Sequence, residues 1–239
     1  MVALRFIIFA ASLVFLFNIK AFAMDIYSKA PSKIEGWKIS CSVDKGSITR
    51  KNGNWLFRTS KNKCKGGIFK QRAEINSLKA ISARDKVKYN FQSIFSMNGG
   101  KYEYEQFDIF QIHDGRDGCA PPLKVTVQGD GKLILRADYK TGAGEKCERD
   151  VMQSSGQSAN WIDRDGTEYK LNIILDFDGK SGFDVQVFLN DKLEVSGKYA
   201  PPKGKGYFQS KYFYFKHGVY SRNMFKYELK SNISMNLIK

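Results

Sequence analysis

Hydrophobic and polar residues alternate along most of this chain, which is the pattern of β-strands that bury one face. Short runs rich in β-branched and aromatic residues occupy 123–128, 132–139 and 169–177, and glycine-containing turns separate them. Asn190-Asp191 joins two further runs and predicts a hairpin. No stretch has the periodicity of a long helix. The spacing therefore predicts one all-β domain, a jelly-roll sandwich of two antiparallel sheets, one of them concave.

The segment 140–160 departs from this alternation. It is polar, contains several glycines and serines, and is long for a connection between two strands. We expect a long surface loop there, and loops of this length often contribute to function.

The stretch YFYFKHGVY (212–220) shows the alternation most clearly. One of its faces is mostly aromatic and aliphatic, as the interior of a sandwich requires, whereas the other combines a lysine with three tyrosines. We interpret that second face as part of a binding groove. A strand here directs Phe213, Phe215, His217 and Val219 inward and Tyr212, Tyr214, Lys216, Gly218 and Tyr220 outward.

Two other stretches have similar polar faces. In 108–115, Ile109, Gln111 and His113 share one side of the expected strand. For one such strand alone, the simpler interpretation is that its polar side faces solvent. For His113 alone, the simpler interpretation is a surface histidine. The second stretch, 69–78, places Lys70, Arg72 and Glu74 on one side.

The N-terminal residues have the composition of a secretory signal peptide. Arg5 precedes an apolar run over 6–17, and the small residues at 21–23 fit a cleavage site. A membrane anchor is the alternative that we weigh less, because the run is too short to span a bilayer. We predict that residues 1–23 are removed and that residues 24–239 form a single exported domain, secreted or periplasmic and monomeric.

The chain is strongly basic, with 39 basic and 24 acidic side chains and a formal net charge of +15. Loss of Arg5 and Lys20 with the signal peptide leaves +13. Such a charge attracts acidic polysaccharide, nucleic acid or a membrane surface. A surface that is basic for solubility alone is the simpler alternative.

All four cysteines follow the predicted cleavage site. An even number in an oxidising compartment predicts two disulfides, although the sequence alone allows three connectivities. We favour Cys41–Cys64 and Cys119–Cys147, because each pair closes a local loop. Neither pair has the spacing of a zinc or thiol-redox motif.

Three stretches, in the same chain order, resemble the motifs of jelly-roll polysaccharide lyases: the family 7 alginate lyases, the glucuronan lyases and the heparin lyase I group. QRAEI (71–75) is similar to their R-x-E-L strand, QIH (111–113) to their Q-[IV]-H strand, and YFKHGVY (214–220) to their Y-F-K-x-G-x-Y strand. The likeness extends over residues 55–222. It implies a concanavalin A-like jelly roll with a concave substrate groove.

The resemblance also implies β-elimination, in which the proton at C5 of a uronic acid is removed and the sugar at C4 leaves. Arg72, Gln111 and His113 then correspond to the groups that neutralise the uronate carboxylate, as an oxyanion site does. Tyr220 corresponds to the acid, and either Tyr220 or His113 to the base. As a base, Tyr220 needs a nearby cation such as Lys216 or Arg72 to favour the phenolate.

The implied substrate is an anionic polysaccharide that contains uronic acid, such as alginate, glucuronan or a heparin-like polymer. The resemblance requires no cofactor, although calcium is compatible with this group, and no partner other than the polysaccharide. The implied substrate contacts are Lys70, Glu74, Tyr212, Tyr214, Lys216 and Arg222.

Three positions depart from the alginate lyase pattern. Asn76 stands where a second arginine is usual, Arg222 where a glutamine is usual, and His217 where a small or apolar residue is usual. These differences weaken the alginate assignment and favour the glucuronan and heparin lyase relatives without choosing between them.

Two other classes of function fit part of the pattern. A non-catalytic, lectin-like carbohydrate-binding protein can use the same sandwich, but it does not need this set of reactive side chains. A nucleic-acid-binding protein would spread cations among exposed aromatic residues. The predicted signal peptide argues against this function. The sequence contains no GxSxG, HExxH or P-loop motif.

Overall fold

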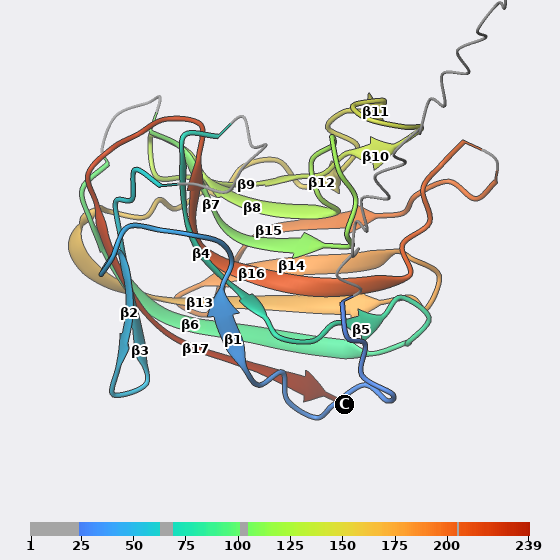
Figure 1. Ribbon diagram of the computed structural model, residues 1–239, viewed down its shortest axis with the longest axis horizontal. Helices are drawn as coiled ribbons and strands as arrows, with labels where there is room; N and C mark the ends of the chain where they lie inside the picture. Colours follow the sequence, from blue (N-terminus) through green and yellow to red (C-terminus); the bar gives the residue numbers. More distant parts are fainter. Residues whose placement is uncertain (1–23, 63–68, 101–104, 205) are drawn as a thin grey trace, which may run out of the picture.

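Two antiparallel β-sheets stack face to face and enclose the core (Figure 1). The computed structural model describes residues 24–62, 69–100, 105–204 and 206–239, which form strands and no α-helix. The predicted all-β sandwich is therefore confirmed. The predicted signal peptide, residues 1–23, lies outside the described residues. No helix in the described part of the chain is long and apolar enough to cross a membrane.

The first sheet has seven strands and contains the three stretches that the sequence singles out. β4, β16 and β7 are neighbours in it although they are far apart in the chain. The predicted strand at 123–128 corresponds to β8. The order is β1 (Trp37–Ile39), β4 (Gln71–Ser77), β16 (Tyr212–Ser221), β7 (Phe107–His113), β8 (Leu123–Val127) and β9 (Leu133–Arg136), with β5 (Ile81–Ser82) paired to the start of β16.

The second sheet has eight strands. The predicted hairpin at Asn190-Asp191 joins two of them, and both turn residues have positive φ, as the common two-residue hairpin turn requires. The order is β12 (Gln153–Ser154), β15 (Lys192–Tyr199), β14 (Phe183–Leu189), β13 (Asp165–Phe177), β6 (Lys88–Asn98), β17 (Glu228–Ile238), β3 (Asn54–Arg58) and β2 (Ile48–Lys51).

The segment 140–160 is more structured than the predicted loop. β10 (Tyr139–Lys140) pairs with β11 (Cys147–Glu148) in a small two-stranded sheet, and β12 adds to the edge of the eight-stranded sheet. Alternation of polar and apolar residues cannot predict strands of this kind, because a strand of two residues is too short to show a repeat.

Alternation along β16 and β7 directs their apolar side chains into the core. Phe213, Phe215 and Val219 of β16 are fully buried, as are Phe110 and Ile112 of β7. Burial of each such side chain stabilises the fold by about 1.5–3 kcal/mol. The inward face predicted for 212–220 is therefore confirmed, which fixes the opposite face outward.

His217 also points inward, as predicted, and connects the two sheets. Its Nδ1 lies 3.0 Å from the carbonyl oxygen of Ile109 and its Nε2 lies 2.8 Å from Ser231 Oγ of β17. A carbonyl only accepts, so Nδ1 carries the hydrogen and Nε2 accepts from Ser231. Burial lowers the pKa of His217 to about 4.

His217→Ala should lower the free energy of unfolding by about 2–4 kcal/mol, because it leaves a cavity and removes the imidazole partner of the Ile109 carbonyl and of Ser231 Oγ, which keeps only its contact with Ser93 Oγ. Thermal unfolding at pH 7 measures this loss. Since the folded-state pKa of His217 is depressed, the unfolded chain binds more protons and stability falls between pH 6.5 and 4. The His217→Ala variant should lose less stability than the wild-type protein between pH 6.5 and 4. If both proteins lost the same stability over that interval, the depressed pKa of His217 would be contradicted.

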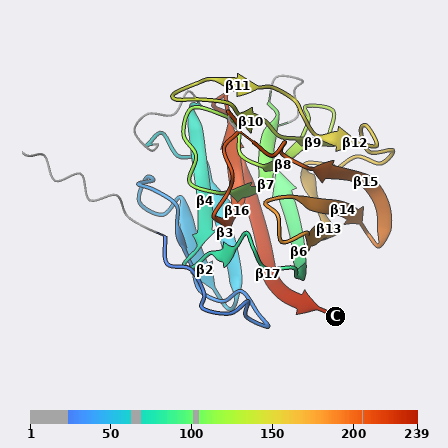
Figure 2. The same cartoon turned by 90° about the vertical axis from the view of Figure 1, so that its right-hand side faces the viewer.

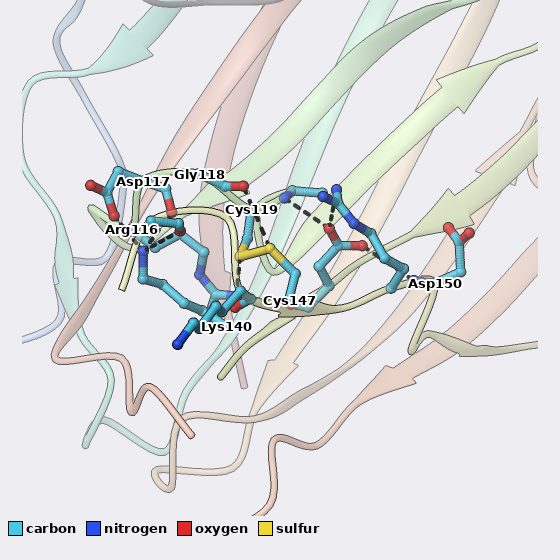
Figure 3. Close-up of a disulfide and its surroundings, with 12 residues drawn as sticks. Arg116, Asp117, Gly118, Cys119, Lys140, Cys147 and Asp150 are labelled. Atoms are coloured by element: carbon cyan, nitrogen blue, oxygen red, sulfur yellow. Dashed lines mark hydrogen bonds and ion pairs between the residues drawn. A yellow bond between two sulfur atoms is a disulfide. The ribbon is translucent and has the colours of Figure 1, made fainter. Parts of the chain in front are cut away.

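A rigid segment follows β7 beside a disulfide (Figure 3). Cys119 and Cys147 are bonded, with Cα atoms 5.8 Å apart, which confirms that pair. The other predicted pair, Cys41–Cys64, lies outside the described residues because Cys64 is not among them. Lys140 donates to the carbonyl oxygens of residues 117 and 144, at 2.7 and 3.1 Å.

Arg116 also holds the segment that follows β7 in place. Its buried guanidinium donates to the Asp114 carboxylate, to the Asp138 carbonyl oxygen at 2.7 Å and to the Tyr199 hydroxyl at 2.8 Å. Satisfied buried polar networks of this kind hold one conformation. The end of β7, where His113 lies, is therefore fixed.

Candidate active site on the seven-stranded sheet

The outward sides of β4, β16 and β7 form one continuous polar face, as the sequence predicts. Antiparallel pairing sets the side chains of β16 level with those of its two neighbours. Side chains that lie opposite one another are close enough to interact. The cross-strand pairs are Arg72–Tyr220, Gln111–Lys216 and His113–Tyr214. We call this surface the polar face.

A chain of hydrogen bonds runs across the polar face. His113 Nε2 lies 3.0 Å from Gln111 Oε1, and Gln111 Nε2 donates to Glu74 Oε1. The second carboxylate oxygen of Glu74 faces Arg72 Nε at 3.7 Å. Glu74 is only 1% exposed, so this carboxylate lies behind the residues at the surface rather than among the predicted substrate contacts.

This chain fixes which nitrogen of His113 carries the hydrogen. Burial raises the pKa of Glu74, while the charges of Lys216 and Arg72 oppose this and favour the ionised form. An ionised carboxylate only accepts, so Glu74 orients the amide nitrogen of Gln111 towards itself and the amide oxygen towards His113. His113 Nε2 must then donate, and Nδ1 keeps its lone pair. Burial, followed by the charges of Lys216 and Arg72, holds the pKa of His113 well below its usual value. The imidazole is neutral at pH 7 and suited to accept a proton.

Tyr220 is held between a cation and an aromatic ring. The Arg72 guanidinium carbon lies 4.2 Å from the centre of its ring, and the ring of Phe69 stacks on it at 4.1 Å. Burial raises the pKa of Tyr220, and Arg72 opposes this only partly. Arg72 is the nearby cation that a phenolate would need, but the effect of burial on the pKa of Tyr220 is larger, so the phenol stays protonated and suits an acid.

Lys216 is nearly buried at the centre of the polar face, 6% exposed. Burial lowers its pKa, and the neighbouring Glu74 carboxylate opposes the shift. Opposite it, Asn76 donates to the carbonyl oxygen of Ser77 at 2.9 Å. Asn76 carries no charge and its amide nitrogen is engaged with the backbone, so of this cross-strand pair only Lys216 can attract an anion.

The other predicted contacts lie towards the two ends of the polar face. Tyr212 and Tyr214 pack together, with ring centres 6.3 Å apart, near His113. Lys70 and Arg222 are exposed at the Tyr220 end, where Arg222 lies 5.5 Å from the ring of Phe69. All ten predicted catalytic and substrate-binding residues thus belong to one face and its ends.

Strict alternation missed Asp108. It places Ile109 outward with Gln111 and His113, but Ile109 is fully buried. Register shifts on both sides of β7 mark a β-bulge, which turns Asp108 to the polar face instead. There it pairs with Lys124 Nζ at 2.9 Å.

Gly218 marks this bulge on β16. Its φ is +137°, and a Cβ there would lie 2.3 Å from the carbonyl oxygen of Ala73. Any other residue would be strained and would push β4 away. The glycine in YFKHGVY is the one sequence signal that marks the irregularity.

The polar face offers cations, an amide, an imidazole and a phenol. Among the residues that the structure describes, no three His, Cys, Asp or Glu side chains are grouped so that they could hold a metal ion. What the face can do chemically is neutralise an anion with Arg72 and Lys216, accept a proton at His113 and donate one from Tyr220.

Neither a protein-family model nor a curated protein sequence matches the chain. Solved structures do. The alginate lyase AlgAT5 of polysaccharide lyase family 7 is 14% identical, with 83% of this chain and 85% of that chain covered and a TM-score of 0.53. An endo-β-1,4-glucuronan lyase from the fungus Trichoderma reesei is 9% identical, with 85% and 88% covered and a TM-score of 0.53.

A third similar structure is a family 7 alginate lyase solved in complex with substrate, as a variant with one histidine changed to asparagine and one tyrosine to phenylalanine. It is 11% identical, with 80% of this chain and 82% of that chain covered and a TM-score of 0.50. Together, the three comparisons show that this chain has the jelly-roll fold of polysaccharide lyases.

Proposed function

We propose that the protein is a polysaccharide lyase that cleaves an anionic, uronic-acid-containing polymer by β-elimination. The observation that carries this proposal is the chain from Glu74 through Gln111 to His113, which sets the hydrogen on Nε2 and leaves Nδ1 unprotonated in a neutral imidazole. A protein that only binds carbohydrate does not need an oriented base on the same face as a protonated tyrosine.

In the proposed reaction, His113 Nδ1 takes the C5 proton of a uronate that lies on the polar face between His113 and Tyr220. The C–H electron pair forms the C4–C5 double bond, and the bond from C4 to its glycosidic oxygen breaks. Tyr220 gives its proton to that departing oxygen. Arg72 and Lys216 stabilise the negative charge that develops on the carboxylate, as preorganised charges do in a site partly closed to water.

The structural relatives support this assignment. The similar structures include alginate lyases and a glucuronan lyase. The one solved with substrate has a histidine and a tyrosine replaced, and the polar face presents one histidine, His113, and three tyrosines, of which Tyr220 is the one beside Arg72. Export by the predicted signal peptide would bring the enzyme to polymers outside the cytoplasm, and a net charge of +13 would attract them.

The test is a screen of polymannuronate, polyguluronate, glucuronan, heparin and hyaluronan for products that absorb in the ultraviolet. Elimination creates a double bond conjugated with the carboxylate, whereas hydrolysis and simple binding do not. We expect absorbance to rise with at least one polymer. Binding without any absorbing product would leave a lectin-like carbohydrate-binding protein as the function.

Turnover should stay nearly constant from below pH 6.5 to above pH 9. On the acid side, His113 loses its activity as a base when pH falls through its depressed pKa or when Glu74, whose pKa burial raises, takes a proton. On the alkaline side, Tyr220 loses its proton when pH rises through its raised pKa. A pH profile of kcat measures both limits. Half-loss at pH 6.5 would contradict the environment assigned to His113.

A further inference from the structure

A basic hollow of about 660 Å³ lies where β16 begins, at the right-hand end of the molecule in Figure 1. Three connections surround it: the one after β5, the turn between β13 and β14, and the loop from β15 to β16. This end faces the viewer in Figure 2. The described residues that line it include no carboxylate and four exposed cations, Arg84, Lys180, Lys203 and Lys211.

A second hollow provides a comparison within the same protein. It has a volume of about 620 Å³ and lies on the outer face of the eight-stranded sheet. Its two lysines are balanced by acids, with Lys88 3.0 Å from Asp176 and Lys198 3.9 Å from Asp184. Lysines are abundant on this chain, so their presence in a hollow is not informative by itself. Of these two hollows, the basic hollow is the one whose lining contains no acidic residue to balance the lysines.

The floor of the basic hollow is fixed by hydrogen bonds. Ser181 Oγ donates to the carbonyl oxygen of Ser210 at 2.9 Å, and Ser210 Oγ donates to Asp114 at 2.6 Å. Ala83 N donates to the carbonyl oxygen of Lys211 at 3.1 Å. Asp114 directly follows His113, so the hollow and the polar face share one buried support.

The hollow also continues the polar face in space. β5 pairs with β16 at Tyr212, which directly follows Lys211. The rings of Tyr212 and Tyr214 then lead towards His113. From Lys211 to Lys216 the strand advances five residues, about 17 Å, so an extended polymer that is bound at the reacting sugar can reach the hollow.

We propose that this hollow binds the anionic groups of the polysaccharide beyond the reacting sugar, and so favours long polymers over short oligosaccharides. The shared chemistry is a regularly spaced carboxylate or sulfate. The proposal rests on the proposed function in one respect, the direction in which the polymer runs along the polar face. It concerns binding and does not require elimination.

The test compares Lys180→Gln/Lys203→Gln with the matched control Lys88→Gln/Lys198→Gln, which removes the same net charge from the other hollow. Binding titrations at low salt use alginate as the carboxylate polymer, heparin as the sulfated polymer, and a tetrasaccharide of each. We expect the first variant to bind at least one polymer about fivefold more weakly, as the loss of two exposed ion pairs allows. The control and the tetrasaccharides should change less than twofold, and added salt should reduce the difference.

The polymer that shows the effect identifies carboxylate or sulfate as the ligand. Three outcomes would overturn the proposal: equal losses in the two variants, an equal loss for the tetrasaccharide, or wild-type protein that binds neither polymer. The ultraviolet screen is read separately. Absence of an absorbing product, with the fivefold loss intact, would reject the lyase and keep the binding site.

Discussion

Tyr220→Phe is expected to abolish elimination while polymer binding stays within several-fold of that of the wild-type protein. The change removes one oxygen and keeps the ring that stacks between Arg72 and Phe69, so packing is preserved. Because burial keeps the phenol protonated at neutral pH, its loss removes the acid, and acids of this kind contribute about 10²–10⁴-fold. The ultraviolet assay, run beside a binding titration, measures both effects.

Tyr214→Phe is the matched control. It removes a hydroxyl from the same strand and the same face, near His113 rather than Arg72, and turnover should fall less than tenfold. Comparable losses in both variants would mean that the face needs its hydroxyls for binding. Full turnover in Tyr220→Phe would rule out Tyr220 as the acid.

The sequence predicts the sandwich and the polar face because both depend on a period of two. Apolar residues at alternate positions of 212–220 can face only the core, and the tyrosines and Lys216 must then face outward. The resemblance placed the three motifs at one substrate groove. The structure adds that their strands are direct neighbours, with Arg72 paired to Tyr220.

The features that alternation could not predict depend on contacts between strands. The bulge at Gly218 reverses the faces of Asp108 and Ile109, and nothing in 108–113 itself indicates this. Likewise, Glu74 shares its outward face with Arg72 in the sequence, but its burial under Gln111 depends on a strand from elsewhere in the chain. The raised pKa of Tyr220 has the same origin, because burial is a property of the packed face.

Glu74→Gln should lower kcat about a hundredfold or more, because it removes the group that orients Gln111. A carboxylate forces the amide nitrogen of Gln111 towards it, whereas an amide at position 74 can either donate or accept. Gln111 can then turn, and His113 loses its single tautomer. In a serine protease, the wrong histidine tautomer costs about 10⁴-fold. Removing a negative charge beside Arg72 and Lys216 does not weaken attraction for an anionic substrate, so KM should not rise.

Nitrogen NMR of the imidazoles separates this role from a structural one. The chain has only two histidines, and their contacts require opposite tautomers, with hydrogen on Nε2 of His113 and on Nδ1 of His217. In Glu74→Gln the His113 signals should move towards a mixture while those of His217 stay unchanged. A merely structural effect would lower the melting temperature and leave both tautomers as they are.

The exchange variant Glu74→Gln/Gln111→Glu gives the sharpest test of the chain. Its carboxylate at position 111 can accept from both the new amide at 74 and His113 Nε2, so the single His113 tautomer should return. Turnover should stay low, because a negative charge then stands at position 111, next to the His113 base and the site of the substrate carboxylate. The adjacent carboxylate should also raise the pKa of His113 relative to the wild-type protein. If the tautomer stayed mixed in the exchange variant, the chain from Glu74 to His113 would not be what holds the base.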